Sequence, residues 1–323
     1  MIPGWIQPLG HCFQKATTMF NDILSPVFIF FWIILGILSV IALLGNGFIT
    51  AMISHQWLQT GKMASCDFLL TSLSTSRFLL QLSSLLGYPV YFNIPEVSFY
   101  YSALAVMSIS WFLFHITSLW SATWLSILYC VKVTNFPNNF FFWLKTRINV
   151  LVPRLFAMSV AVSIIVSLPS FVCYFQDEKS CNLTDTQSVN NYQNLFFAPI
   201  SLHFTIMAIN FSLNVTASIL LLASLWRHTR NLRENGIALK DLNTQVHIKV
   251  MKSILLYLFL YVLYITSMML ATAHILKYGR PERLVTEILL SALSAVHSAI
   301  LISTNPKLKK ASAYILKIRE RAS

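Results

Sequence analysis

The stretch YYSALAVMSISWFLFHITSLWSATWLSILYCV, from Tyr100 to Val131, is a long run of mostly apolar and small polar residues without Asp, Glu, Lys or Arg. At about 1.5 Å rise per residue, a helix of this length more than crosses a hydrocarbon layer roughly 30 Å thick. Helical spacing places Trp111, His115, Ser118 and Ala122 on one stripe. Because lipid offers polar groups no water partners, this stripe must face other helices or a wet cavity. The stretch therefore predicts a central membrane helix.

The composition of the whole chain extends this prediction. Of its 323 residues, 56% are hydrophobic and 11% are charged, whereas soluble domains carry roughly 25% charged residues. Apolar segments of helical length recur from one end of the chain to the other, so a soluble core with a single anchor is excluded. These runs are continuous rather than alternating, which favours helices over a barrel of strands. We therefore predict an all-α membrane protein.

Seven segments have the length and apolarity of membrane spans. The second carries Arg77 near its middle, and the last ends just before Asn305-Pro306. The predicted spans are 25–54, 65–88, 100–131, 148–172, 194–225, 249–276 and 283–304. We expect residues 1–24 to form an extracellular N-terminal tail, 25–304 the seven-transmembrane domain, and 305–323 a short, basic cytoplasmic tail. The N-terminus lacks a basic segment followed by a short apolar one, so no cleavable signal peptide is expected.

The positions of the basic residues orient this seven-helix bundle. With the N-terminus outside, 16 of the 23 lysines and arginines fall on the inner face and 5 on the outer face, as the positive-inside rule requires. The net charge of +12 then indicates attachment to anionic inner-leaflet lipids and a cytoplasmic partner, and no nucleic acid is expected as a partner. Asn182, in a sequon of the longest outer loop, is the expected glycosylation site. Cys173 and Cys181 lie outside in the same arrangement, but the sequence leaves their pairing, and that of Cys12, open.

Patterns typical of enzymes and metal proteins are not found in the sequence. No serine, histidine and acidic residue converge on one predicted pocket, no cysteines or histidines have metal-ligand spacing, and no glycine-rich loop could hold a phosphate. We therefore expect no enzymatic activity, no metal and no cofactor.

Short motifs in the spans are more informative in their order than singly. They are Asn46-Gly47-Phe48-Ile49, Leu73-Ser74-Thr75-Ser76-Arg77, LWSATWL at 119–125, LYCVKVTNF at 128–136, LKTRI at 144–148, SLWRHT at 224–229, His247 with Lys252 and LLY at 255–257, and HSAILI at 297–302 followed by Asn305 and Lys307-Leu308-Lys309. From about residue 40 to 312 this series resembles the bitter taste receptors, the type 2 family of taste receptors. The resemblance implies a G-protein-coupled receptor, although the acidic-Arg-Tyr triplet of the rhodopsin-like class is missing after Tyr129.

What the resemblance implies can be stated residue by residue. A small, mostly apolar bitter compound would bind in the outer half of the bundle and activate a heterotrimeric G protein with a gustducin-type alpha subunit at the plasma membrane. The receptor would be competent as a monomer, and pairing with itself or another receptor is left open. The expected ligand-binding residues are Trp111, His115, Tyr261, Glu287 and His203. Asn46, Arg77 and His297 are expected to be structural or switch residues, and Lys132, Lys145, Arg227 and Arg230 to face the G protein.

Two further interpretations accompany this assignment. The polar residues Ser291, Ser294, Asn210 and Asn214 are better explained as hydrogen-bonding partners between helices, worth about 0.6 kcal/mol each, than as ligand contacts. For the chain as a whole, buried Arg77, His115 and Glu287 would also suit an ion path in a small transporter or channel. The odd number of spans and the lack of an internal repeat argue against that class. A pheromone-type chemosensory receptor of related build is the third alternative.

Overall fold

A computed structural model describes residues 26–93, 97–134, 139–180, 188–234, 242–272 and 281–322. All regular secondary structure in these ranges is helical, in eight α-helices. The helices are α2 (Pro26–Thr60), α3 (Ser65–Asn93), α4 (Val97–Val133), α5 (Asn139–Ser180), α6 (Ser188–Glu234), α7 (Leu242–Thr272), α8 (Pro281–Thr304) and α9 (Pro306–Ala322).

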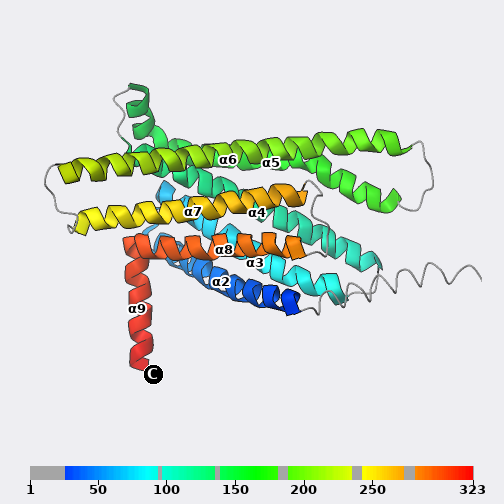
Figure 1. The fold of residues 1–323 in the computed structure, drawn as a ribbon, viewed down its shortest axis with the longest axis horizontal. Helices are drawn as coiled ribbons and strands as arrows, with labels where there is room; N and C mark the ends of the chain where they lie inside the picture. The colour runs from blue at the N-terminus through cyan, green and yellow to red at the C-terminus, as the bar shows by residue number, and fades with distance from the viewer. Residues whose placement is uncertain are drawn as a thin grey trace, which may run out of the picture.

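Helices α2 to α8 run along the long axis of the molecule, and α9 turns away from one end of it (Figure 1). Helix α3 packs against α2 and α4, α8 packs against α2 and α7, and α4 also contacts α5 and α6. The stretch that suggested a central helix from its sequence is therefore in contact with α3, α5 and α6. This arrangement places the polar stripe of α4 inside the bundle.

Six of the described helices are long and apolar enough to cross a membrane, in the ranges Ile29–Thr60, Ile109–Val133, Phe142–Val166, Thr205–Asn231, Val250–Met269 and Leu284–Thr304. The prediction of an all-α, multi-span membrane protein is confirmed. Helix α3 falls outside this group because Asp67, Arg77, Gln81 and several serines interrupt its apolar residues. Its 29 residues are nevertheless long enough to span a bilayer. The seventh span therefore stays a prediction.

Three apolar clusters hold the described helices together, and the smallest joins α4, α6 and α7. The largest joins α2, α3, α4 and α5 and includes Ile49, Leu70, Leu128 and Val152. The second is centred on the tyrosines of α7 and packs them against α4, α6 and α8. At Gly45 a Cβ atom would lie 2.9 Å from the Cβ of Ser298, so glycine is required where α2 and α8 approach each other.

The helices at the α9 end of the bundle are linked by short corners. Gly61 follows α2 with a φ of 62°, the left-handed conformation that commonly ends a helix. The chain then reaches α3 through residues 62–64. Between α8 and α9, the side-chain oxygen of Asn305 accepts a hydrogen bond of 3.0 Å from the Lys307 amide, and Pro306 occupies the first position of the new helix. This pairing of a capping residue with proline starts α9 in a defined direction.

Candidate functional site: a polar and aromatic column inside the bundle

The polar stripe of α4 belongs to a column of side chains within the bundle. It forms the upper part of this column, which is the part farther from α9. Trp111 stacks on His115, one turn further along, with ring centroids 4.8 Å apart and planes inclined by 19°. The Nε2 atom of His115 is hydrogen-bonded to the hydroxyl of Tyr264 on α7. His115 is almost completely buried and Trp111 is half-buried. Two predicted ligand-binding residues therefore lie together, and a tyrosine that was not among them joins α4 to α7.

The tyrosines of α7 continue the column. The hydroxyl of Tyr261 donates a hydrogen bond of 2.9 Å to the Oδ1 atom of Asn210 on α6. Its ring stacks on Tyr257 at 5.8 Å and on Phe211 of α6 at 6.0 Å. Because Tyr261 is only 1% exposed in this conformation, its hydroxyl serves packing between α6 and α7. A direct contact with a ligand would require these helices to move.

Below the tyrosines, the column ends at a charged residue. Nη1 of Arg77 on α3 lies 2.6 Å from Nδ1 of His297 on α8, and its Nε donates a 3.2 Å hydrogen bond to Ser118 of α4. The ring of His297 packs against Tyr257, with centroids 4.4 Å apart. A charge inside a membrane protein requires such partners, since the unpaired group costs several kcal/mol. Arg77 and His297 were both predicted as structural or switch residues, but the sequence did not indicate that they contact each other.

A second polar chain lies beside Arg77 and joins α2, α3 and α8. The Nδ2 atom of Asn46 donates to the hydroxyl of Ser294 at 3.0 Å and to the Ala42 carbonyl at 2.8 Å. Gln81 of α3 accepts a hydrogen bond from Ser291 at 3.1 Å and donates one of 2.6 Å to Ser39 of α2. Asn46 is thus held by α8 and by its own helix.

The interpretation of the small polar residues as partners between helices is confirmed for four positions. Ser291 and Ser294 join α8 to α3 and α2, and Asn210 accepts from Tyr261. Asn214 of α6 donates to Thr123 of α4 at 3.3 Å and to Tyr257 at 3.4 Å. Such contacts are individually weak, and together they determine how the helices are rotated against each other.

The remaining predicted ligand-binding residues lie on α8 and α6. Glu287 is half-buried on α8 and interacts electrostatically with the hydroxyl of Tyr264, which places it near the upper part of the column. His203 belongs to α6, but its side chain lies outside the described residues. Asn182, Cys12 and Cys181 also lie outside them, as does the side chain of Cys173.

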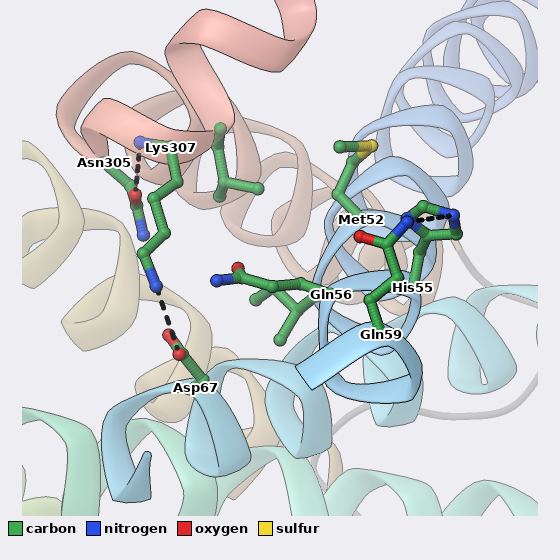
Figure 2. Close-up of a pocket in the computed structure, with 9 residues that line it drawn as sticks. Met52, His55, Gln56, Gln59, Asp67, Asn305 and Lys307 are labelled. Carbon is green, nitrogen blue, oxygen red and sulfur yellow. Dashed lines mark hydrogen bonds and ion pairs between the residues drawn. The ribbon is translucent and has the colours of Figure 1, made fainter. Parts of the chain in front are cut away.

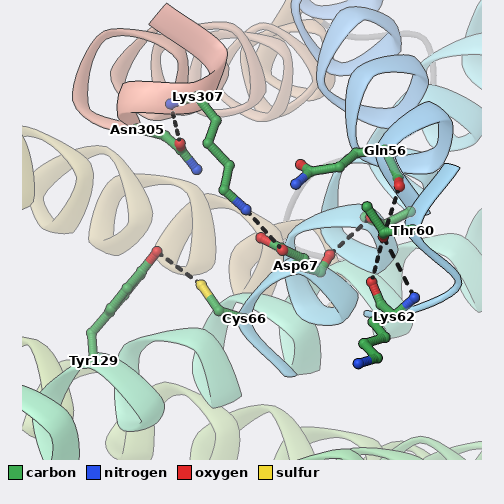
Figure 3. Close-up of polar contacts among 9 residues, drawn as sticks. Gln56, Thr60, Lys62, Cys66, Asp67, Tyr129, Asn305 and Lys307 are labelled. Carbon is green, nitrogen blue, oxygen red and sulfur yellow. Dashed lines mark hydrogen bonds and ion pairs between the residues drawn. The ribbon is translucent and has the colours of Figure 1, made fainter. Parts of the chain in front are cut away.

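The predicted G-protein contacts lie at the α9 end of the bundle or on the helices leading to it. Lys132 is exposed at the end of α4, and Arg227 and Arg230 are exposed near the end of α6. Lys145 is half-buried in the first turns of α5. At the same end, Nζ of Lys307 on α9 lies 3.5 Å from a carboxylate oxygen of Asp67 on α3 (Figure 3). The sequence had assigned Lys307 to the basic tail and did not single out Asp67.

Two further observations bear on the kind of chemistry present. In the part of the chain that the structure describes, no three histidine, cysteine or acidic residues are close enough to hold a metal ion. Cys66, next to Asp67, lies 3.2 Å from the hydroxyl of Tyr129, so the start of α3 is also joined to the end of α4 (Figure 3). The contacts of Cys66 and Asp67 join one helix to another. Their residues donate and accept hydrogen bonds, and they do not form a set of nucleophile, base and oxyanion donors.

Long apolar helices with a polar column between them define a multi-pass helical membrane protein, and comparison with known proteins shows which kind. The family described as "Taste receptor protein (TAS2R)" matches residues 23–320. The chain is 33% identical to taste receptor type 2 member 41 of Rattus norvegicus over 294 residues, which cover 88% of this chain and 94% of the relative. It is 31% identical over 290 residues to member 7 of Mus musculus, with 86% and 91% covered. Squid rhodopsin is 16% identical with a TM-score of 0.43, covering 91% of this chain and 87% of that one.

The chain belongs to the type 2 taste receptor family. It is a bitter taste receptor, a G-protein-coupled receptor in a membrane, and not an enzyme. The transporter, channel and pheromone-receptor alternatives are therefore set aside.

Proposed function

We propose that seven spans, α2 to α8, cross the plasma membrane with the N-terminus outside, and that a small, mostly apolar bitter compound binds at the end of the bundle away from α9. The distribution of basic residues supports this orientation. Lys132, Arg227, Arg230 and Lys307 then all reach the cytoplasmic side. Asn182 falls outside, where it can be glycosylated.

The observation that carries the proposed binding site is the stacked and hydrogen-bonded set of Trp111, His115 and Tyr264. Trp111 offers an aromatic face, and Glu287 near Tyr264 provides a carboxylate for a protonated amine. Attraction between such charges is stronger in a site shielded from bulk water than at a surface. Trp111 and Glu287 are therefore the proposed direct contacts, with His115 and Tyr261 behind them, and His203 of α6 is kept as a further proposed contact.

The same column offers a path from ligand to G protein. His115 is bonded to Tyr264, Tyr257 of the same helix stacks on Tyr261 and packs against His297, and His297 is bonded to Arg77. An agonist shifts the receptor towards the active conformer only as far as it binds that conformer more tightly. We infer that the agonist changes the contact of α4 with α7, and that Arg77, His297 and Asn46 adopt different partners in the two conformers. In the conformer favoured by the agonist, Lys132, Lys145, Arg227 and Arg230 are arranged for contact with a gustducin-type G protein.

The binding site is tested by calcium release in cells that express the receptor with a chimeric gustducin-type alpha subunit. A panel of bitter compounds first identifies an agonist. The variants Trp111→Ala and Glu287→Gln should then lose the response or shift it to higher concentration, while surface expression is kept. Phe259→Ala is the matched control, since Phe259 is an exposed aromatic residue of α7. Unchanged dose–response curves for Trp111→Ala and Glu287→Gln would remove both residues from the binding site.

A further inference from the structure

A cavity of about 330 Å³ lies at the α9 end of the bundle, and Trp111 is not among the residues that line it. It is bounded by α2, α3 and the start of α9, and its volume is within the range of small-ligand sites. Figure 2 shows its lining, which is Met52, Ile53, His55, Gln56, Gln59, Asp67, Asn305, Lys307 and Leu308. None of these residues belongs to the polar column, so the cavity is separate from the proposed agonist site.

The cavity contains one charge of each sign, and both groups retain hydrogen-bonding capacity. A single contact of 3.5 Å joins Nζ of Lys307 to Oδ2 of Asp67. An ammonium group has three donors, and a carboxylate has two oxygens that each accept more than one hydrogen bond. In the part of the chain that the structure describes, the second carboxylate oxygen of Asp67 accepts no hydrogen bond. A ligand that carries an anionic and a cationic group close together could therefore hydrogen-bond to both Lys307 and Asp67 without breaking the contact between them.

Side-chain amides complete the polar lining. The amide group of Gln56 extends from α2 towards the Asp67–Lys307 pair (Figure 2). Among the described residues this amide has no hydrogen-bond partner. Gln59 and His55 lie on the same helix, with Nε2 atoms 3.5 Å apart. Amide N–H groups can donate to an anion beside Lys307, and amide oxygens can accept from a cation beside Asp67.

The apolar part of the lining and its surroundings indicate an amphipathic ligand. Met52, Ile53 and Leu308 provide hydrocarbon surface next to the charged pair. On α2, Leu58 is 76% exposed and Trp57 is also exposed, as expected for residues that face lipid. A tryptophan and charged residues at one level of a membrane helix mark the depth of the phospholipid headgroups.

We propose that this cavity binds the headgroup of an amine-bearing zwitterionic phospholipid, with its ammonium on Asp67 and its phosphate on Lys307. A primary ammonium donates hydrogen bonds to the carboxylate and to the Gln56 oxygen, whereas a trimethylammonium donates none. The site therefore prefers phosphoethanolamine to phosphocholine. Only the leaflet that supplies the lipid depends on the proposed orientation, and in that orientation it is the inner one.

The test is native mass spectrometry of the purified receptor in micelles that contain either phosphatidylethanolamine or phosphatidylcholine with the same acyl chains. We expect the first bound lipid to be retained about tenfold more, or above, with the ethanolamine headgroup, as one charge-assisted hydrogen bond implies. Asp67→Asn should abolish this preference, and Lys307→Gln should lower retention of both lipids. Lys310→Gln is the matched control, because Lys310 is exposed on α9 and does not line the cavity.

Two outcomes would overturn the proposal: equal retention of the two lipids by the unchanged receptor, or a preference that survives Asp67→Asn. Adding an excess of soluble phosphoethanolamine tests whether the cavity binds the free headgroup or only the intact lipid. Loss of the ethanolamine lipid would show that the headgroup alone suffices, and its retention would show that the lipid is the ligand. The measurement needs neither agonist nor G protein and does not depend on membrane orientation. It can therefore fail while the agonist responses of the receptor remain intact.

Discussion

Arg77 of α3 bonds to α8, and Lys307 of α9 contacts α3. Both residues are basic, but their surroundings differ completely. Arg77 is 5% exposed and bonded to His297 and Ser118. Lys307 is 60% exposed and makes one contact of 3.5 Å, with Asp67, which is 22% exposed. The first cation has exchanged water for directed hydrogen bonds, and the second remains largely hydrated. A buried charge loses far more when a partner is removed than an exposed one, so only the Arg77 contacts should be essential to the fold.

The largest effect is expected from removing the partner of the buried cation. His297→Ala leaves a guanidinium group without its main acceptor, and we expect a loss of about 3 kcal/mol or more in stability. Surface expression and thermal unfolding of the purified receptor, followed by tryptophan fluorescence, measure this loss.

The control for this change replaces both partners by apolar residues of similar size, Arg77→Met with His297→Leu. The double variant should recover part of the lost stability, because it leaves no uncompensated charge. A His297→Ala variant as stable as the unchanged receptor would remove the distinction between Arg77 and Lys307.

A second effect tests how closely α2 packs on α8 next to His297. Gly45→Leu forces a side chain against Ser298 and should cost about 1–3 kcal/mol, as overpacking does. Gly36→Leu in the same helix is the matched control, since no atom lies within 4 Å of a Cβ placed there. Thermal unfolding of the two variants should therefore differ. Equal melting temperatures would mean that α2 and α8 can separate at little cost.

A smaller effect is expected for a neutral hydrogen bond in the column. Tyr261→Phe removes the hydroxyl that donates to Asn210, and we expect a loss of about 1 kcal/mol. A double-mutant cycle with Asn210→Leu gives the coupling between the two side chains, which should be about 0.6–1.7 kcal/mol. A coupling near zero would show that this bond does not join α6 to α7 in the membrane.

The smallest effect on stability belongs to the exposed pair. Asp67→Asn should change the free energy of unfolding by less than about 1 kcal/mol, and high salt should reduce the difference further. Exchanging the two charges, Asp67→Lys with Lys307→Asp, should restore most of the stability that Asp67→Asn loses. If Asp67→Asn lowered the free energy of unfolding as much as His297→Ala, the different hydration of Arg77 and Lys307 would not explain their different contributions to stability.

The sequence predicts the helices well because a membrane span is a local property. A run of apolar residues long enough to cross the bilayer appears as such without any knowledge of its neighbours. Helices α2 to α8 overlap their predicted spans, and α8 ends just before Asn305-Pro306 as expected, whereas helix α9 was not predicted. The ends are less well predicted: α5 begins at Asn139, whereas the span was expected from residue 148.

Contacts between helices were predicted less completely, since they depend on how distant segments are rotated against each other. Burial in lipid showed that Arg77 needs partners, but nothing local indicated His297, which lies 220 residues away. Tyr264 was not among the predicted ligand-binding residues, and its bond to His115 adds a second tyrosine of α7, after Tyr261, to the predicted site. The pairing of Asp67 with Lys307 was missed because Lys307 belonged to a basic cluster suited to anionic lipids. The available signal was an acidic residue, Asp67, in the first turn of the second predicted span.

The corner at Asn305 has a mechanical consequence. The Asn305 amide donates to Leu301 of α8 and its carbonyl accepts from Lys309 of α9, both at 2.9 Å, so the corner residue is hydrogen-bonded to both helices. A rigid rod of 17 residues therefore extends from the last span, and its length is about 25 Å. A tilt of α8 by about 10° would swing the far tip of such a lever through roughly 4 Å. Small rearrangements among buried side chains would thus be magnified at the membrane surface.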